Sequence, residues 1–170
     1  MKTFILRLLG LVIVVSLAWF WVMLSAAPAY AQAKTVNYTY TDVSDRDFSY
    51  ADLVGGVFAA AKMKKTNFQG ANLTNSIFTK GSLLEANLSG ANLTNSFFDR
   101  ATLNRANLTN AIFTEATMTS TTFDGAKITG ADFTDAIIDR YQVSQMCKRA
   151  SGINPVTGIS TRESLACPAK

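Results

Sequence analysis

Histidine is absent from all 170 residues of the chain, which removes the commonest general base and the commonest metal ligand. Cysteine is nearly absent, with only Cys147 and Cys167. Charge is also sparse and balanced, because residues 46–140 carry nine basic and nine acidic side chains. A neutral segment of this kind does not indicate nucleic acid binding. With no cofactor-binding motif either, we expect no enzyme activity, no cofactor, no bound metal and no nucleic acid partner.

The first thirty or so residues differ from the rest and are typical of a secretory signal. Lys2 and Arg7 precede an apolar run over residues 8–24, and small residues follow at Ala29 and Ala31. We expect residues 1–31 to form a cleaved signal peptide, with Ala33 as the second choice of cleavage site. The alternative is an uncleaved anchor, since about 17 apolar residues is close to the lower limit for a spanning helix. After cleavage we expect no stable membrane insertion and a charge near +2, from 14 basic and 12 acidic residues.

A period of five residues dominates the chain from Phe48 to Ile138. A helix does not have this period, and a strand would alternate without resetting every five residues. The position two residues earlier holds only Ala, Ser, Gly or Thr from Ala51 to Ala136. We therefore predict a solenoid of short extended pieces and corners, with large and small side chains both facing inward. The large inward residues are Phe48, Leu53, Phe58, Met63, Phe68, Leu73, Phe78, Leu83, Leu88, Leu93, Phe98, Leu103, Leu108, Phe113, Met118, Phe123, Ile128, Phe133 and Ile138.

Within this period, residues 46–140 resemble the pentapeptide repeat family. The resemblance implies an all-β solenoid, a right-handed quadrilateral β-helix with four five-residue faces per coil, in which residues twenty apart stack. The matching motif A-[ND]-L-x-x, or its variant with Phe, occurs at Ala71-Asn72-Leu73, Ala86-Asn87-Leu88, Ala91-Asn92-Leu93, Ala106-Asn107-Leu108 and Ala131-Asp132-Phe133.

Outward residues predict the corners and the surface of the coil. Residues that tolerate positive φ form one column, which we expect to turn by type II corners: Gly70, Gly90, Asn110 and Gly130. At the equivalent positions of other columns we expect type I-like corners, at Lys65, Lys80, Arg100 and Arg105. Two stacked columns predict an amide ladder of Asn67, Asn87 and Asn107, and a charge ladder of Lys65, Glu85 and Arg105.

Both ends of the solenoid need covering, because open strand edges recruit other chains. Residues 32–45 alternate apolar and polar side chains and predict a strand-like N-terminal cap, with regular coiling beginning just after Arg46. Residues 141–170 predict a short α-helical C-terminal cap, whose first helix ends at Gly152. Ser160, with Glu163 three residues later, is a capping-box signal for a second helix. In an oxidising compartment, Cys147 and Cys167 are expected to form one disulfide between the helices.

The signal, the coils and the Cys-bridged tail NPVTGISTRESLAC together are similar to the lumenal pentapeptide-repeat proteins of cyanobacteria and chloroplasts. The resemblance implies a thylakoid lumen, with a periplasm second. The leading hypothesis is a non-enzymatic structural or protein-interaction module whose partner, process and oligomeric state the sequence does not name. Lys80 and Arg100 are the candidate interaction face.

Three alternative functions remain. A DNA-mimicking topoisomerase inhibitor requires a strongly negative rod, which a neutral repeat region with an export signal does not provide. The Cys147 and Cys167 pair could instead make a redox-responsive protein. A catalytic pair among the outward acids Asp99, Asp124 and Asp139 is disfavoured, because a convex prism offers no pocket that excludes water.

Overall fold

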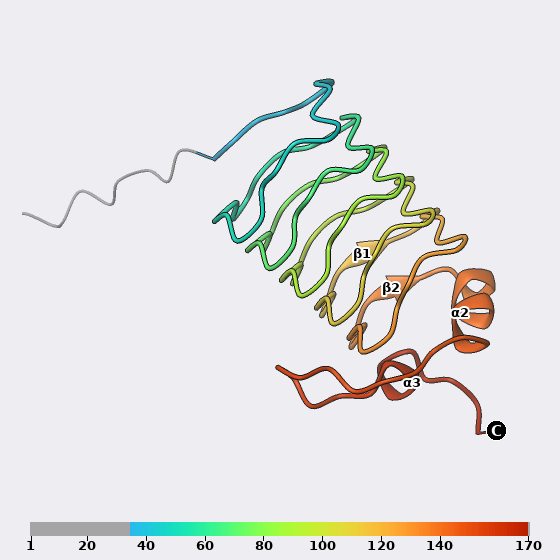
Figure 1. Ribbon diagram of the computed structural model, residues 1–170. Coiled ribbons are helices and arrows are strands. Elements are labelled where there is room, and N and C mark those ends of the chain that lie inside the picture. The colour runs from blue at the N-terminus through green and yellow to red at the C-terminus, as the bar shows by residue number, and fades with distance from the viewer. Residues whose placement is uncertain (1–34, 170) are drawn as a thin grey trace, which may run out of the picture. The chain divides into compact units, whose positions relative to one another are not determined.

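The computed structural model describes residues 35–169, and the predicted signal peptide lies outside this range. Parallel bridges join residues twenty apart along the solenoid, from Asn37 with Val57 to Ile112 with Asp132. The same register holds between β1 (Thr117–Met118) and β2 (Ile137–Ile138). Because a turn recurs every five residues and the register is twenty, each coil has four faces, and the coils stack up to the C-terminal helices (Figure 1).

Each corner is a four-residue turn whose third residue has a left-handed backbone. All twenty corner residues from position 40 to position 135 have φ between 53° and 68°. Lys65, Lys80 and Arg100 belong to this set, so the prediction of type I-like corners at the basic residues was wrong. The cause is stacking: the amide of Lys80 donates to the carbonyl of Asp99 in the next coil, at 2.9 Å. The same bond to the next coil recurs at the sixteen corners from Tyr40 to Glu115 and stabilises the left-handed conformation there, which costs about 1–2 kcal/mol in a residue other than glycine.

The interior consists of the predicted large and small columns. Seventeen of the nineteen large residues are buried, while Phe48 and Ile138, at the two ends of the series, are partly buried against the core. Phe58, Phe78 and Phe98 stack with ring centroids 5.0 and 4.6 Å apart. Polar members of the small column are also buried, and their hydroxyls donate to nearby carbonyls: Thr66, Ser76, Ser96 and Thr121.

Regular coiling begins earlier than the sequence predicted. Val43 is fully buried, and the bridges of Asn37 and Asp42 have the twenty-residue register. The boundary just after Arg46 is therefore too late. Arg46 occupies a position that is small and inward in later coils, yet it is exposed with its guanidinium carbon 6.0 Å from the ring centre of Tyr38. The first coil has no described coil packed before it, so a long side chain can leave the interior there.

The C-terminal cap contains α2 (Arg140–Cys147) and α3 (Thr161–Ser164). The Cys147–Cys167 disulfide joins its two parts with the Cα atoms 5.5 Å apart, as predicted. The capping signal is confirmed in part: the Ser160 hydroxyl accepts from the amide of Glu163 at 3.2 Å.

The helix α2 ends at Cys147 and not at Gly152. The reason lies in Arg149, whose guanidinium donates to the coil carbonyls of Phe123 and Ala126 at 2.7 and 3.2 Å. Arg149 thus follows the end of α2 and joins this segment to the last coil.

Candidate protein-interaction face

One of the four faces carries a column of mostly apolar, outward-facing side chains, partly or largely exposed and interrupted by Thr117, which we call the apolar stripe. Its members stand one residue before the inward series, so the alternation of an extended segment turns them outward. Each pairs directly with the next across the parallel coils. Phe97 and Ile137 are the most open, with 49% and 59% of their surface exposed. The apolar stripe consists of Val57, Ile77, Phe97, Thr117 and Ile137.

The other three faces are polar at the same position. Two of them have no apolar residue there, and the third has only Ile112. The stripe is therefore a property of one face and not of the repeat. Sequence reasoning missed it, although every twentieth residue from Val57 would have shown it. The three polar columns are Asp42, Lys62, Ser82, Thr102, Thr122; Asp47, Asn67, Asn87, Asn107, Lys127; and Asp52, Asn72, Asn92, Ile112, Asp132.

Lys80 and Arg100, the basic pair predicted from the sequence, lie at the corner of this same face. Arg100 remains largely exposed while its guanidinium pairs with Asp99 at 2.8 Å. The hydroxyl of Thr119 and then the guanidinium of Arg100 hold the pKa of Asp99 below its usual value. Asp99 is therefore anionic at neutral pH and orders Arg100. We call Lys80 and Arg100 the basic border of the stripe.

The opposite face carries the amide ladder, which the structure confirms and extends by one residue. Asn67 donates to Asp47 at 2.9 Å, Asn87 to Asn67 at 3.0 Å and Asn107 to Asn87 at 3.2 Å. Each asparagine oxygen also accepts from the amide two residues later. The ladder satisfies its own polar groups and leaves fewer of them for a partner. The pKa of Asp47 is lowered chiefly by the amide and hydroxyl of Ser49, with a smaller effect of the Asn67 amide.

The remaining charged candidates do not converge on one site. Glu85 pairs with Arg105 at 3.0 Å, which confirms that part of the charge ladder. Asp139 accepts from the amide of Ser120 at 2.8 Å, while Asp99 binds Thr119. Within residues 35–169, no group of three or more acidic or cysteine side chains could hold a metal ion.

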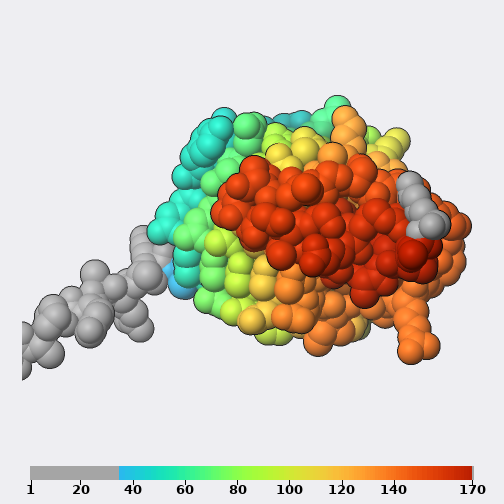
Figure 2. All heavy atoms as spheres, turned by 90° about the horizontal axis from the view of Figure 1, so that it is seen from below, coloured from blue at the N-terminus to red at the C-terminus, as the bar shows by residue number. Residues whose placement is uncertain are grey.

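The C-terminal cap seals the last coil through contacts that the sequence did not reveal. The buried side chain of Asn154 donates to the carbonyl of Gly130 at 2.9 Å. The hydroxyl of Thr161 donates to the carbonyl of Ile128. Gly152 lies so close that a Cβ there would stand 2.8 Å from the Gly130 nitrogen. Figure 2 shows the cap spread over the end of the solenoid.

These features define a repeat protein of the solenoid class, with flat sides and a sealed C-terminal end. The sequence model described as Pentapeptide repeats matches residues 47–79, 82–119 and 103–139, with eight copies, and the chain belongs to this family. Its fold is therefore the right-handed quadrilateral β-helix, and a pentapeptide repeat protein is a structural or interaction module.

Solved structures that are similar to the chain include the following two. One is a pentapeptide repeat protein from the thylakoid lumen of Arabidopsis thaliana, with 38% identity and a TM-score of 0.74, over 85% of this chain and 98% of that one. The other is HetL of the cyanobacterium Nostoc, a pentapeptide repeat protein involved in heterocyst differentiation regulation. It has 24% identity and a TM-score of 0.55 over 57% of this chain and 46% of that one, a similarity of fold. No match was found among curated proteins. In the part of the chain that the structure describes, no helix is long and apolar enough to cross a membrane.

Proposed function

We propose that this protein is an exported, non-enzymatic interaction module of the thylakoid lumen, and that it binds a protein partner through the apolar stripe and its basic border. The observation that carries the proposal is the restriction of the stripe to one of four otherwise polar faces. Exposed apolar surface that gathers on one face and is rimmed by polar groups is typical of interaction sites in soluble proteins.

The lumenal address is supported by three independent features. Residues 1–31 have the layout of a cleaved signal peptide. The Cys147–Cys167 disulfide is typical of an oxidising compartment. The 38% identical relative comes from a thylakoid lumen. A periplasm is the second choice of compartment.

The exposed apolar area, the rigidity and the charge of this face indicate the kind of partner that it binds. Full burial of a Phe or Ile side chain contributes about 1.5–3 kcal/mol, so covering the exposed halves of Phe97 and Ile137 contributes about 1 kcal/mol each. Backbone bonds already fix the face, so binding loses little conformational entropy there. Lys80, together with the exposed part of Arg100 that Asp99 only partly neutralises, favours a partner with acidic residues beside an apolar patch.

Cross-linking in intact photosynthetic membranes that carry the tagged full-length chain tests this proposal. We expect the wild type to capture one protein, identified by mass spectrometry. The double variant F97S/I137S should lose that protein because it removes the two most exposed members of the stripe. The matched control I112S removes an outward apolar residue from a neighbouring face and should retain capture.

A second pair of variants tests the basic border. K80E and R100E should weaken capture and remain folded. Glu85 and Glu115 already occupy equivalent corner positions with a left-handed backbone, with φ of 60° and 59°. Exposed changes of this kind usually alter stability by under about 0.5 kcal/mol. Capture that survives both sets of variants would refute the assignment of this face. Inhibition of DNA supercoiling by the purified domain would contradict the whole proposal.

A further inference from the structure

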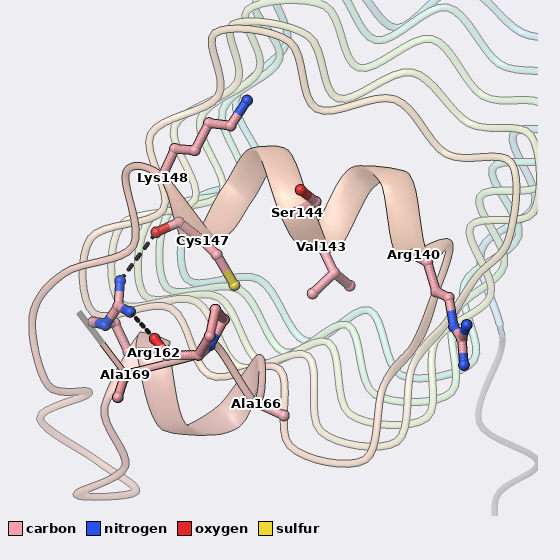
Figure 3. Close-up of a pocket in the computed structure, with 9 residues that line it drawn as sticks. Arg140, Val143, Ser144, Cys147, Lys148, Arg162, Ala166 and Ala169 are labelled. Carbon is pink, nitrogen blue, oxygen red and sulfur yellow. Dashed lines mark hydrogen bonds between the residues drawn. The ribbon is translucent and has the colours of Figure 1, made fainter.

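The C-terminal cap contains a recess of about 540 Å³ between α2 and α3, beside the disulfide (Figure 3). Side chains of small and apolar residues line much of it, including Val143, Ala166 and Pro168. Figure 3 shows Val143 and the sulfur of Cys147 directed toward the space between the two helices. The volume lies within the range of about 300–1,000 Å³ that is usual for small-molecule sites.

The walls of the recess are held by Arg162. Its guanidinium donates to the carbonyl of Cys147 at 3.0 Å and to that of Pro168 at 2.6 Å. Arg162 therefore connects the end of α2 to the segment after α3, as the disulfide also does. Two constraints therefore join the same pair of segments, which form the walls of the recess.

The electrostatic character of the recess is positive. Arg140, Lys148 and Arg162 line it, and no acidic residue does. Residues 140–169 as a whole carry four basic residues and one acid, Glu163. The two ion pairs found within residues 35–169 involve Arg100 and Arg105, so the guanidinium of Arg140 has no carboxylate partner there. Lys148 donates to the neutral side chain of Gln145, and Figure 3 shows its ammonium group directed away from the space between the helices, so within residues 35–169 Arg140 is the free cation at this site.

We propose that this recess binds a small organic oxyanion with an apolar body. Arg140 receives the anionic group, because a planar guanidinium offers paired donors that match a carboxylate or phosphate. Val143, the Cys147–Cys167 disulfide and Ala166 contact the apolar body. The site does not depend on the apolar stripe, so either proposal can fail while the other stands.

An NMR titration of the ¹⁵N-labelled domain, with the disulfide intact, tests the proposal with four probes. Hexanoate combines a carboxylate with an apolar chain, hexanol lacks the charge, hexylammonium reverses it and inorganic phosphate lacks the chain. We expect hexanoate to shift the amides of Ser144, Ala166 and Ala169. Hexanol and phosphate should bind at least about tenfold more weakly, and hexylammonium should not bind.

Two variants separate this site from general attraction to a basic surface. R140Q removes the charge and keeps a shorter polar side chain at an exposed position, so the domain should fold and lose hexanoate affinity about tenfold. The matched control K127Q removes an exposed cation that does not line the recess and should bind as the wild type does. The proposal is wrong if hexanoate fails to bind, if hexanol binds equally well, if the shifts map to the coils, or if R140Q is unaffected.

Discussion

Asn154 offers the sharpest test of how the solenoid is closed. Its side chain is fully buried against the last coil. The amide nitrogen donates to the carbonyls of Gly130 and Asn110 at 2.9 and 3.2 Å, while the oxygen accepts from the amides of Val156 and Thr157 at 2.9 and 3.2 Å. One side chain therefore provides a hydrogen-bond donor to two coil carbonyls and also holds the loop that covers the last coil.

Two substitutions separate these roles. N154A removes these four hydrogen bonds together with a fifth, to the carbonyl of Ala111 at 3.4 Å, and leaves the buried carbonyl of Gly130 without this donor. At about 0.5–1.5 kcal/mol for each net bond, with partial rescue by water, we expect a loss of about 2–4 kcal/mol in the free energy of unfolding. N154D keeps the acceptor that binds Val156 and Thr157 but sets a carboxylate against the carbonyl of Gly130. At neutral pH it should cost at least as much as N154A.

The pH dependence of N154D distinguishes repulsion from lost packing. Burial beside carbonyl oxygens raises the pKa of the introduced carboxyl group in the folded state above the unfolded value of about 3.9. At pH values between the unfolded and the folded pKa, the folded state binds more protons than the unfolded state. The stability of N154D relative to wild type therefore falls as pH rises through this range and recovers as pH decreases. Protonation also restores a donor toward Gly130.

Denaturant unfolding followed by circular dichroism, with the disulfide intact, measures these differences from pH 4 to pH 8. The control N104A removes a single bond, in which the Asn104 side chain accepts from the amide of Asp124 at 3.0 Å, and should cost about 1 kcal/mol or less. The reasoning fails if N154A costs no more than N104A, or if N154D matches the wild type at every pH.

Three further predictions concern the core, the disulfide and the surface acids. A91L should destabilise the protein by about 1–3 kcal/mol or more, measured by the same unfolding assay, because Ala91 is fully buried in a square interior. Replacing Cys147 and Cys167 by serine should cost about 3 kcal/mol of chain entropy, while hydrogen exchange in the coils stays unchanged; exchange that rises throughout the coils would contradict this. T119V should raise the pKa of Asp99, measured by carboxyl NMR, since the Thr119 hydroxyl is the first cause of its depression. Because the pKa of Asp99 is lowered in the folded state, this carboxylate stabilises the protein at pH values above its unfolded pKa, and the stabilisation is lost as pH falls through the folded pKa. T119V should therefore reduce the loss of unfolding free energy over that acidic range.

The interior could be predicted from the sequence because it depends on local alternation. A large residue at every fifth position and a small one two residues earlier can both face inward only if the chain turns every five residues. Burial of Leu88, Ala91 and Leu93 follows from this pattern. The same local reasoning identified the cap of α3, since Ser160 and Glu163 are only three residues apart.

The twenty-residue register did not follow from spacing. It came from the resemblance to a family, and the bridges between coils establish it. Only this register brings Val57, Ile77 and Phe97 into one column, so the candidate face could not be recognised from individual repeats. The register also brings Lys80 and Arg100 to the edge of that face.

The corners and the C-terminal seal were decided by tertiary structure. Lys80 has no intrinsic preference for a left-handed backbone, yet it adopts one because its amide must meet the carbonyl of Asp99 in the next coil. Asn154 lies next to a proline and predicts only a loop, but its partners Asn110 and Gly130 are 44 and 24 residues away. Local sequence specifies which side chains enter the core. Hydrogen bonds between residues far apart in the sequence determine the backbone conformation at positions where intrinsic propensity would favour a different conformation.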